Sequence, residues 1–138
     1  MHEEALISII APMYNEEAAI DIFFAEMRNF LAECPYQYEI VCVNDGSKDN
    51  TLDILKKYAE EDNRIKIVSF SRNFGKERAL YAGLKYSSGD AVIPIDVDLQ
   101  NPPMTIKTFL AKWEEGYDIV YGVRENRKNE GRLRRFLS

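Results

Sequence analysis

The chain has 138 residues, of which 46% are hydrophobic and 30% are charged. This balance is typical of a single globular domain and excludes a disordered chain. The net charge of −5 argues against a general nucleic-acid-binding protein. Residues 124–138 carry six Lys or Arg against two Glu, a net +4, whereas residues 1–123 carry 12 Lys or Arg against 21 Asp or Glu, a net −9. A basic end on an acidic body predicts an anionic neighbour for that end.

Several classes of protein lack their sequence marks. The start "MHEEALISII" has no basic segment and predicts no signal peptide, and no run approaches the ~20 apolar residues of a membrane span, so the chain is expected to be soluble. Cys34 and Cys42 form no CxxC pair and are expected to be reduced. Neither GxGxxG nor GxxxxGK[ST] is present, which disfavours dinucleotide-binding and P-loop folds. The single histidine, His2, stands near the terminus and argues against histidine-based catalysis.

Short apolar runs rich in Ile and Val predict five strands, in chain order 6–12, 38–43, 65–70, 91–95 and 118–122. Apolar residues at helical spacing predict four helices, at 20–31, about 51–61, about 76–86 and after Pro103. Asn15 is the expected N-cap of the first helix, and Asp49, Asn50 or Thr51 that of the second. This alternation predicts an α/β fold with a mostly parallel sheet and helices on both faces. The end "GRLRRFLS" has helix-forming residues and no stop signal, so the natural chain is expected to continue.

Every predicted strand ends in a polar cluster: "PMYNEE", "NDGSKDNT", "SRNFGK", "DVDLQNPP" and "GVRENR". Ligands of open parallel sheets bind beyond the carboxyl ends of the strands. The agreement of five strand ends therefore predicts a binding site at that edge.

The fourth cluster contains the paired aspartates Asp96 and Asp98. Alternate residues of an extended segment face the same side, so the two carboxylates are expected to point together while Val97 points into the core. Two like charges so close repel unless a cation joins them, and Mg²⁺ or Mn²⁺ prefers such oxygen ligands. Gln100 adds a neutral oxygen donor. A solvated acidic loop or a pair of helix caps is the alternative, but the neighbouring polar clusters favour a metal.

The first two clusters permit both ordinary and functional interpretations. Asp-Gly and Asp-Asn form turns and caps, yet Asp45 is left free to accept hydrogen bonds from a base or a ribose. Pro12 is expected to end regular pairing, and Tyr14 is placed to pack on a base or ribose. A surface turn before a helix explains this first cluster too, although it does not require Tyr14.

Basic side chains follow the third and fifth strands. Arg72, Lys76 and Arg78 suit phosphate binding and equally suit the solvated flank of a surface helix. Arg124 is the better candidate for a bidentate phosphate contact. The later basic residues fit an anionic acceptor, lipid headgroups or a plain solvated tail: Arg127, Lys128, Arg132, Arg134 and Arg135.

The segments "SIIAPMYNEEAAI", "VNDGSKDNT", "SRNFGKERALYAGL", "DVDLQNPP" and "DIVYGVR" together resemble the family-2 glycosyltransferases with a GT-A fold. They are most similar to the branch that moves a sugar from a nucleotide donor to a polyprenyl phosphate, such as dolichyl-phosphate mannosyltransferases and bactoprenol glucosyltransferases. The resemblance covers nearly the whole chain, in order. It implies that Pro12, Tyr14 and Glu16, with Val43 and Asp45, hold the nucleoside.

The resemblance also implies roles at the later strand ends. Asp96, Asp98 and Gln100 would hold the metal, Mg²⁺ or Mn²⁺, and the diphosphate. Val97 stands where this branch usually has Ala or Ser, and an inward side chain should be tolerated there. Asp98 and Arg124 are the implied catalytic residues, with Arg124 on phosphates.

Arg135 lies in a basic pair that the family places before a membrane-associated helix, where it would reach the acceptor phosphate. The resemblance therefore divides the chain into a nucleotide-sugar-binding GT-A core, residues 1–124, and a basic segment, 125–138, leading to an acceptor or membrane-side region beyond this C-terminally truncated chain. The longer protein is expected at the cytoplasmic face of a membrane.

The implied reaction is transfer from a UDP- or GDP-sugar to a polyprenyl phosphate with inversion at the anomeric carbon. A phosphate monoester is already largely ionised at neutral pH and needs no strong general base, whereas a hydroxyl acceptor does. Two alternatives stay open: a transferase of the same fold acting on a glycan hydroxyl, and a non-catalytic module that binds nucleotide sugars.

Overall fold

The computed structural model describes residues 5–98, 103–116, 119–124 and 131–136, and the side chains of 5–98, 107, 108 and 110–116. It forms two compact units, one spanning Glu3–Asn101 and the other containing Pro102–Ser138. Each unit is described by itself.

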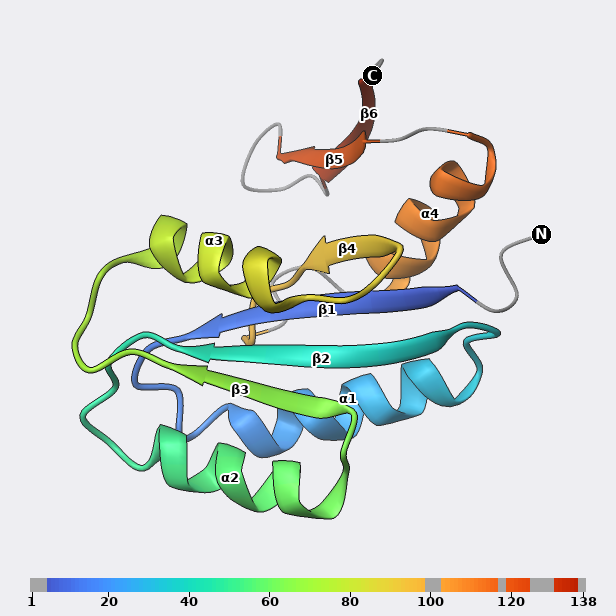
Figure 1. Cartoon of the computed structure of the whole chain (residues 1–138). Helices are drawn as coiled ribbons and strands as arrows, with labels where there is room; N and C mark the ends of the chain where they lie inside the picture. Colours follow the sequence, from blue (N-terminus) through green and yellow to red (C-terminus); the bar gives the residue numbers. More distant parts are fainter. Residues whose placement is uncertain (1–4, 99–102, 117–118, 125–130, 137–138) are drawn as a thin grey trace. The chain divides into compact units, whose positions relative to one another are not determined.

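The larger unit is a four-stranded parallel sheet in the order β3-β2-β1-β4, and its strand arrows all point the same way in Figure 1. This α/β arrangement confirms the predicted fold class. The strands lie within about two residues of the predicted runs. In chain order its elements are β1 Leu6–Met13, α1 Ile20–Ala32, β2 Gln37–Asn44, α2 Thr51–Glu61, β3 Ile65–Ser69, α3 Lys76–Tyr86 and β4 Ala91–Pro94.

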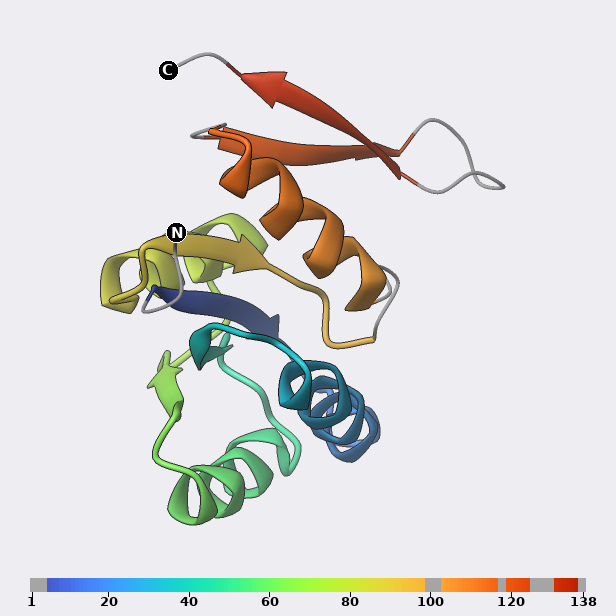
Figure 2. The same ribbon diagram turned by 90° about the vertical axis from the view of Figure 1, so that its right-hand side faces the viewer.

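Helices cover both faces of this sheet, as predicted. Side chains alternate along each strand, and Ile10, Val41 and Val43 meet Ala79 and Ala82 of α3 in one buried cluster. The helix approaches closely, because a Cβ on residue 83 of α3, a glycine, would lie 2.3 Å from Cγ2 of Ile10. The other two helices, α1 and α2, lie on the opposite side of the sheet (Figure 2).

Contacts between α1 and α2 join these two helices. The rings of Phe24 and Tyr58 stack with centroids 4.3 Å apart. The Tyr58 hydroxyl also donates a 2.6 Å hydrogen bond to Asp21. Burial, with this hydrogen bond, raises the pKa of Tyr58 to about 12, so the phenol stays a neutral donor at physiological pH.

Pro12 does not end the pairing of β1, contrary to the prediction. Its register partner is Val43, and Met13 still pairs with Asn44. Backbone groups of successive residues point to opposite sides of a strand. The carbonyl of Ile10 accepts from Ile95, so the missing N–H of Pro12 faces the side where the ladder with β4 ends. Pairing with β2 therefore loses nothing.

A buried carboxylate holds the amino-terminal edge of the sheet together. Glu39 accepts 2.6 Å hydrogen bonds from the Ser8 hydroxyl and the Ser88 N–H, and lies 2.6 Å from Lys66 Nζ. Burial alone would raise the pKa of Glu39, but these partners, Lys66 foremost, bring it below its ordinary value. Glu39 is therefore ionised in the folded protein and fixes the turn between α3 and β4.

The smaller unit contains α4 Pro103–Glu114, β5 Ile119–Arg124 and β6 Gly131–Phe136. Helix α4 begins at Pro103 as predicted. Strand β5 was expected to extend a parallel sheet, but it pairs antiparallel with β6 instead. The helical tendency of Gly131–Phe136 is likewise overridden by this strand pairing, because propensity is a minor term beside tertiary contacts. Of the helices described, none is long and apolar enough to cross a bilayer.

Candidate functional site

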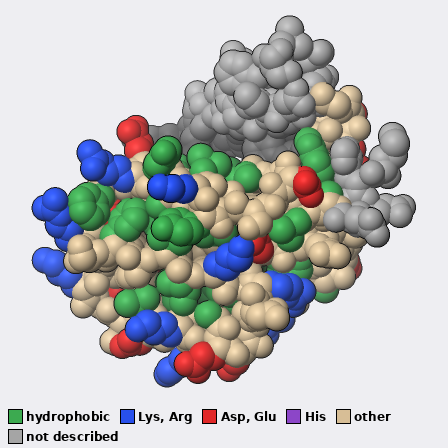
Figure 3. All heavy atoms as spheres, in the orientation of Figure 1, with side chains coloured by type: hydrophobic (Ala, Val, Ile, Leu, Met, Phe, Trp, Pro, Cys, Tyr) green, Lys and Arg blue, Asp and Glu red, His purple; other side chains and the backbone are tan. Residues whose placement is uncertain are grey.

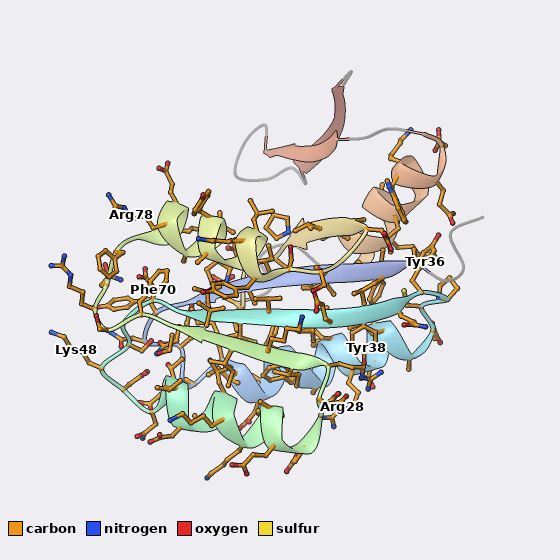
Figure 4. All side chains as sticks on the ribbon, in the orientation of Figure 1. Arg28, Tyr36, Tyr38, Lys48, Phe70 and Arg78 are labelled. Carbon is orange, nitrogen blue, oxygen red and sulfur yellow. The ribbon has the colours of Figure 1, made fainter. Side chains whose placement is uncertain are left out.

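The carboxyl ends of all four parallel strands meet at one edge of the larger unit. The loops that leave this edge contain the predicted polar clusters. Lys48, Phe70 and Arg78, labelled in Figure 4, lie toward this end of the sheet, whereas Arg28, Tyr36 and Tyr38 lie toward the other. The polar clusters that follow β1 to β4 therefore lie at one edge of the sheet, as predicted.

The loops after β1 and β2 are joined by reciprocal hydrogen bonds. The N–H of Asn15 donates to the Ser47 hydroxyl at 2.9 Å, and the N–H of Lys48 donates to the Asn15 side chain at 2.8 Å. Asn15 adopts a positive φ of 54°, a conformation that asparagine tolerates better than most residues. The prediction that Asn15 caps α1 is therefore wrong. Ala19 stands at the N-cap of α1, without a side-chain hydrogen bond.

The start of α2 is satisfied from both loops. Asn50, one of the three predicted candidates, stands at the N-cap of α2 without a side-chain hydrogen bond. The Asp49 carboxylate before it accepts from the Thr51 N–H at 2.9 Å. The Thr51 hydroxyl in turn accepts from the N–H of Glu16 at 2.9 Å. Burial alone would raise the pKa of Asp49, but the hydrogen bonds, those from Thr51 foremost, bring it below its ordinary value.

Asp45 is buried, with 4% of its surface exposed, and both of its carboxylate oxygens have donors. Oδ1 accepts from the Phe74 N–H at 2.7 Å, and Oδ2 accepts from the Gly75 N–H and the Asn73 amide, both at 3.0 Å. The prediction that this carboxylate is left free is therefore wrong for this structure. It fixes the loop between β3 and α3, thirty residues along the chain.

Gly46 makes this contact between loops possible. Its φ is +70°, and an added Cβ would lie 2.1 Å from the carbonyl carbon of Arg72 and 2.3 Å from the backbone nitrogen of Asn73. Both are backbone atoms, so no rotamer change relieves the clash. The Asp-Gly pair therefore serves a close approach of two loops in addition to a turn.

Val43, predicted to contact the nucleoside, has its side chain fully buried against α3. Pro12 is half-buried, and Tyr14 is 44% exposed. Tyr14 thus remains accessible for packing on a ring, as predicted from its position.

Phe74 is an aromatic residue of this edge that the sequence interpretation missed. It is 37% exposed, and the guanidinium carbons of Arg72 and Arg78 lie 4.6 and 6.0 Å from its ring centroid. Figure 3 shows hydrophobic side chains grouped with Lys and Arg where α3 and the strand ends lie. The phenylalanine within "SRNFGK", which stands between Arg72 and Lys76, was the available signal.

Carboxylates from three loops lie near one another. Burial raises the pKa of Glu16, and the negative charges of Asp98, Asp49 and Asp96 raise it further, in that order. Val97 is buried, with 2% exposed, whereas Asp98 is exposed and Asp96 half-buried. The inward and outward alternation of this segment is confirmed.

One cation already contacts this cluster. Lys76 Nζ, at the start of α3, lies 2.8 Å from Oδ1 of Asp96. Within the part of the chain that the structure describes, no group of three or more His, Cys, Asp or Glu side chains is arranged to hold a metal ion.

Three predicted site residues lie outside the described side chains. Gln100 lies outside the described residues altogether. Arg124 and Arg135 are placed only by their backbones, in β5 and β6, where they pair with Gly131 and Val120 respectively. Their predicted contacts with phosphate stay predictions.

A cavity of about 680 Å³ lies at the opposite, amino-terminal edge. Two of its three cations already have acidic partners: Arg64 pairs with Asp62, and Lys66 with Glu39. The cavity is therefore a poor candidate for the site, which we assign to the carboxyl edge.

Curated relatives match almost the whole chain. An uncharacterised glycosyltransferase of Synechocystis sp. is 52% identical over 132 residues, which are 96% of this chain and 42% of that protein. The bactoprenol glucosyl transferase of Shigella phage SfV is 50% identical over 129 residues, 94% of this chain and 42% of that protein. The chain thus spans less than half the length of these relatives.

Solved glycosyltransferases share the fold. A mannosyltransferase from Pyrobaculum calidifontis, in complex with GDP-Man and Mn²⁺, superposes with a TM-score of 0.74 at 21% identity, covering 89% of this chain and 36% of that one. Glucosyl-3-phosphoglycerate synthase from Mycobacterium tuberculosis, in complex with Mn²⁺, UDP and glucosyl-3-phosphoglycerate, gives a TM-score of 0.60 at 26% identity, covering 81% and 40%. The family described as glycosyl transferase family 2 matches residues 8–138. The chain belongs to glycosyl transferase family 2, and its fold is that of the GT-A glycosyltransferases.

Proposed function

We propose that the chain is the nucleotide-sugar-binding part, residues 1–124 with the basic segment 125–138, of an enzyme that transfers a sugar from a UDP- or GDP-sugar to a polyprenyl phosphate. The observation that carries this proposal is the gathering of Glu16, Asp96 and Asp98 at the carboxyl edge of the sheet. The similarity to a bactoprenol glucosyl transferase at 50% identity supports the acceptor class.

The oxygen donors at this edge have the chemistry that suits a divalent cation. Burial raises the pKa of Glu16, and the nearby charges of Asp98, Asp49 and Asp96 raise it further. Carboxylate oxygens are the ligands that Mg²⁺ and Mn²⁺ prefer. Asp96, Asp98 and Gln100 would hold the ion, leaving further positions to donor phosphates and water. The bound ion would neutralise charge on the departing nucleoside diphosphate. A structural neighbour at 26% identity was solved with Mn²⁺ and UDP.

The nucleoside would lie against the loops after β1 and β2. Tyr14 has the exposed ring for this contact, beside Pro12 and Glu16. Because the carboxylate of Asp45 holds the loop after β3, its contribution to the nucleoside would include the positioning of that loop, and Val43 would contribute only its backbone.

The proposed reaction is a direct displacement. An oxygen of the acceptor phosphate forms a bond to the anomeric carbon while the bond from that carbon to the diphosphate breaks, and the nucleoside diphosphate leaves with the electron pair. The configuration inverts. Arg124 would contact phosphates at the reacting centre and Arg135 the acceptor phosphate, and the longer protein would then lie beside the membrane that holds the lipid.

Thermal unfolding of the chain with UDP or GDP, with and without Mn²⁺, tests the donor site. Nucleotide at about 100 times its Kd should add roughly 2.7 kcal/mol of apparent stability, or about 5–10 °C at this size. The shift should require Mn²⁺ and be lost in Asp98→Asn but not in Glu26→Gln, a carboxylate-to-amide change on the exposed face of α1. A shift that ignores both Mn²⁺ and Asp98 contradicts the proposed site.

Transfer of labelled sugar tests the acceptor. Product should form on a short-chain polyprenyl phosphate and not on free glycans. Transfer to a glycan hydroxyl alone would favour the second transferase class, and donor binding without any transfer in the longer protein would favour a binding module.

A further inference from the structure

Lys76 is held by the fold at the edge of the carboxylate cluster. It is the first residue of α3, and the preceding Gly75 donates its N–H to the buried Asp45 carboxylate at 3.0 Å. From this fixed point its Nζ lies 2.8 Å from Oδ1 of Asp96, which follows β4. The side chain of Lys76 is 63% exposed and that of Asp96 is 29% exposed, so this pair can exchange with ions from solvent.

The ammonium group and a divalent cation need the same carboxylate. A metal ion that binds Asp96 must displace Lys76 or share Asp96 with it, and like charges repel at such short range. Lys76 has a flexible four-carbon stem, so the displaced ammonium can move while its Cα stays fixed. It would then be available to an anion that binds with the metal.

We propose that Lys76 is a positioning residue that pairs with Asp96 in the absence of donor, competes with the divalent cation for that carboxylate, and pairs with the donor diphosphate once displaced. The inference rests on the proposed function. It makes metal binding depend on the donor: the ion alone has to displace a lysine, whereas the ion with its diphosphate provides that lysine with a new partner.

This role predicts two effects of opposite sign for Lys76→Gln. Mn²⁺ alone should bind more tightly, by about two- to fivefold, because an exposed ion pair no longer competes. UDP in the presence of Mn²⁺ should bind more weakly, by a similar or larger factor, because the diphosphate loses a cation. A purely structural role for Lys76 would weaken both, or neither.

Electron paramagnetic resonance of free Mn²⁺ measures the first constant, and calorimetric titration of UDP at saturating Mn²⁺ measures the second. The two measurements are made on the wild-type chain, Lys76→Gln, Lys76→Arg and the matched control Lys85→Gln, which removes a charge from the last turn of the same helix. Lys76→Arg should keep both wild-type constants to within about twofold, and the control should change neither. Constants of Lys76→Gln that move in the same direction, or stay unchanged, overturn the inference.

Asp98→Asn separates this inference from the proposed function. Loss of Mn²⁺-dependent UDP binding in Asp98→Asn, with unchanged constants in Lys76→Gln, would overturn the role of Lys76 and leave the proposed donor site intact. A wild-type chain that binds neither UDP nor GDP with Mn²⁺ would overturn both.

Discussion

Asp45→Asn removes the charge from the carboxylate that holds the loop between β3 and α3. Three donors converge on this group: the N–H of Phe74 at 2.7 Å, the N–H of Gly75 at 3.0 Å and the amide of Asn73 at 3.0 Å. An asparagine has one oxygen and one NH₂, so at least one of these donors would face another donor in a buried site.

The expected loss of stability follows from these contacts. A buried donor left without an acceptor costs about 1–3 kcal/mol, and hydrogen bonds to a charged group are worth roughly 1 kcal/mol more than neutral ones. We therefore expect Asp45→Asn to lower the free energy of unfolding by about 3 kcal/mol. At this chain length that corresponds to about 10 °C in the midpoint.

Urea and thermal unfolding in the absence of nucleotide and metal measure this loss directly. Amide hydrogen exchange supplies a local readout, because the N–H groups of Phe74 and Gly75 should lose protection. Glu26→Gln is the control, since it makes the same chemical change at an exposed position. Stability within about 0.5 kcal/mol of that control, with protection of both amides retained, would refute the reasoning that Asp45 holds this loop.

Three further substitutions test other parts of the fold. Gly46→Ala should cost more than the ~1–2 kcal/mol of a left-handed alanine, because its Cβ would lie 2.1–2.6 Å from three backbone atoms. Gly116→Ala is the control: with φ +101° and nothing within 4 Å, it should cost the strain alone. Equal losses in urea unfolding would contradict the clash. Glu39→Gln should lower the free energy of unfolding by about 2–3 kcal/mol at pH 7. Because the pKa of Glu39 is lowered in the folded state, this stability difference between wild type and variant should be complete above the unfolded pKa of 4.5 and should vanish as pH falls through the folded pKa. Glu16→Gln should raise the midpoint of thermal unfolding at pH 7, because the pKa of Glu16 is raised in the folded state. This gain over the wild type should disappear below about pH 4.5. A gain that is absent at both pH 4 and pH 7 would count against the carboxylate cluster.

Local sequence patterns predicted most of the fold correctly. Runs such as 38–43 contain enough Ile and Val to identify β2 within about two residues of its observed ends. The exception is the end of the chain. Strand β6 exists because Gly131–Phe136 pairs antiparallel with β5, and no local pattern distinguishes such a segment from a short helix rich in Leu and Arg. Pairing between segments is a tertiary property.

At the candidate site, too, local patterns predicted correctly, whereas contacts between residues distant in sequence were missed. The prediction placed Val97 inward correctly, although Val97 and Asp98 lie in a turn after β4 and not in an extended strand. The partners of Asp45 were missed, because residues 73–75 are thirty residues away in sequence. The prediction that Asn15 caps α1 was wrong for the same reason. A cap is a local structure, whereas the actual partners of Asn15 are Ser47 and Lys48 in another loop.

The contacts of Asp45 and Lys76 connect the loops across the edge of the sheet. The Asp45 carboxylate fixes Gly75, the next residue Lys76 begins α3, and the ammonium of Lys76 reaches Asp96. The proposed nucleoside side is thereby connected to the proposed metal side through one hydrogen bond, one peptide unit and one ion pair. Weakening the hydrogen bond between Gly75 and Asp45 should therefore weaken the ion pair between Lys76 and Asp96. Asp45→Asn should alter the affinity for Mn²⁺ in the same direction as Lys76→Gln, although Asp45 itself makes no contact with Asp96 and is not an expected metal ligand.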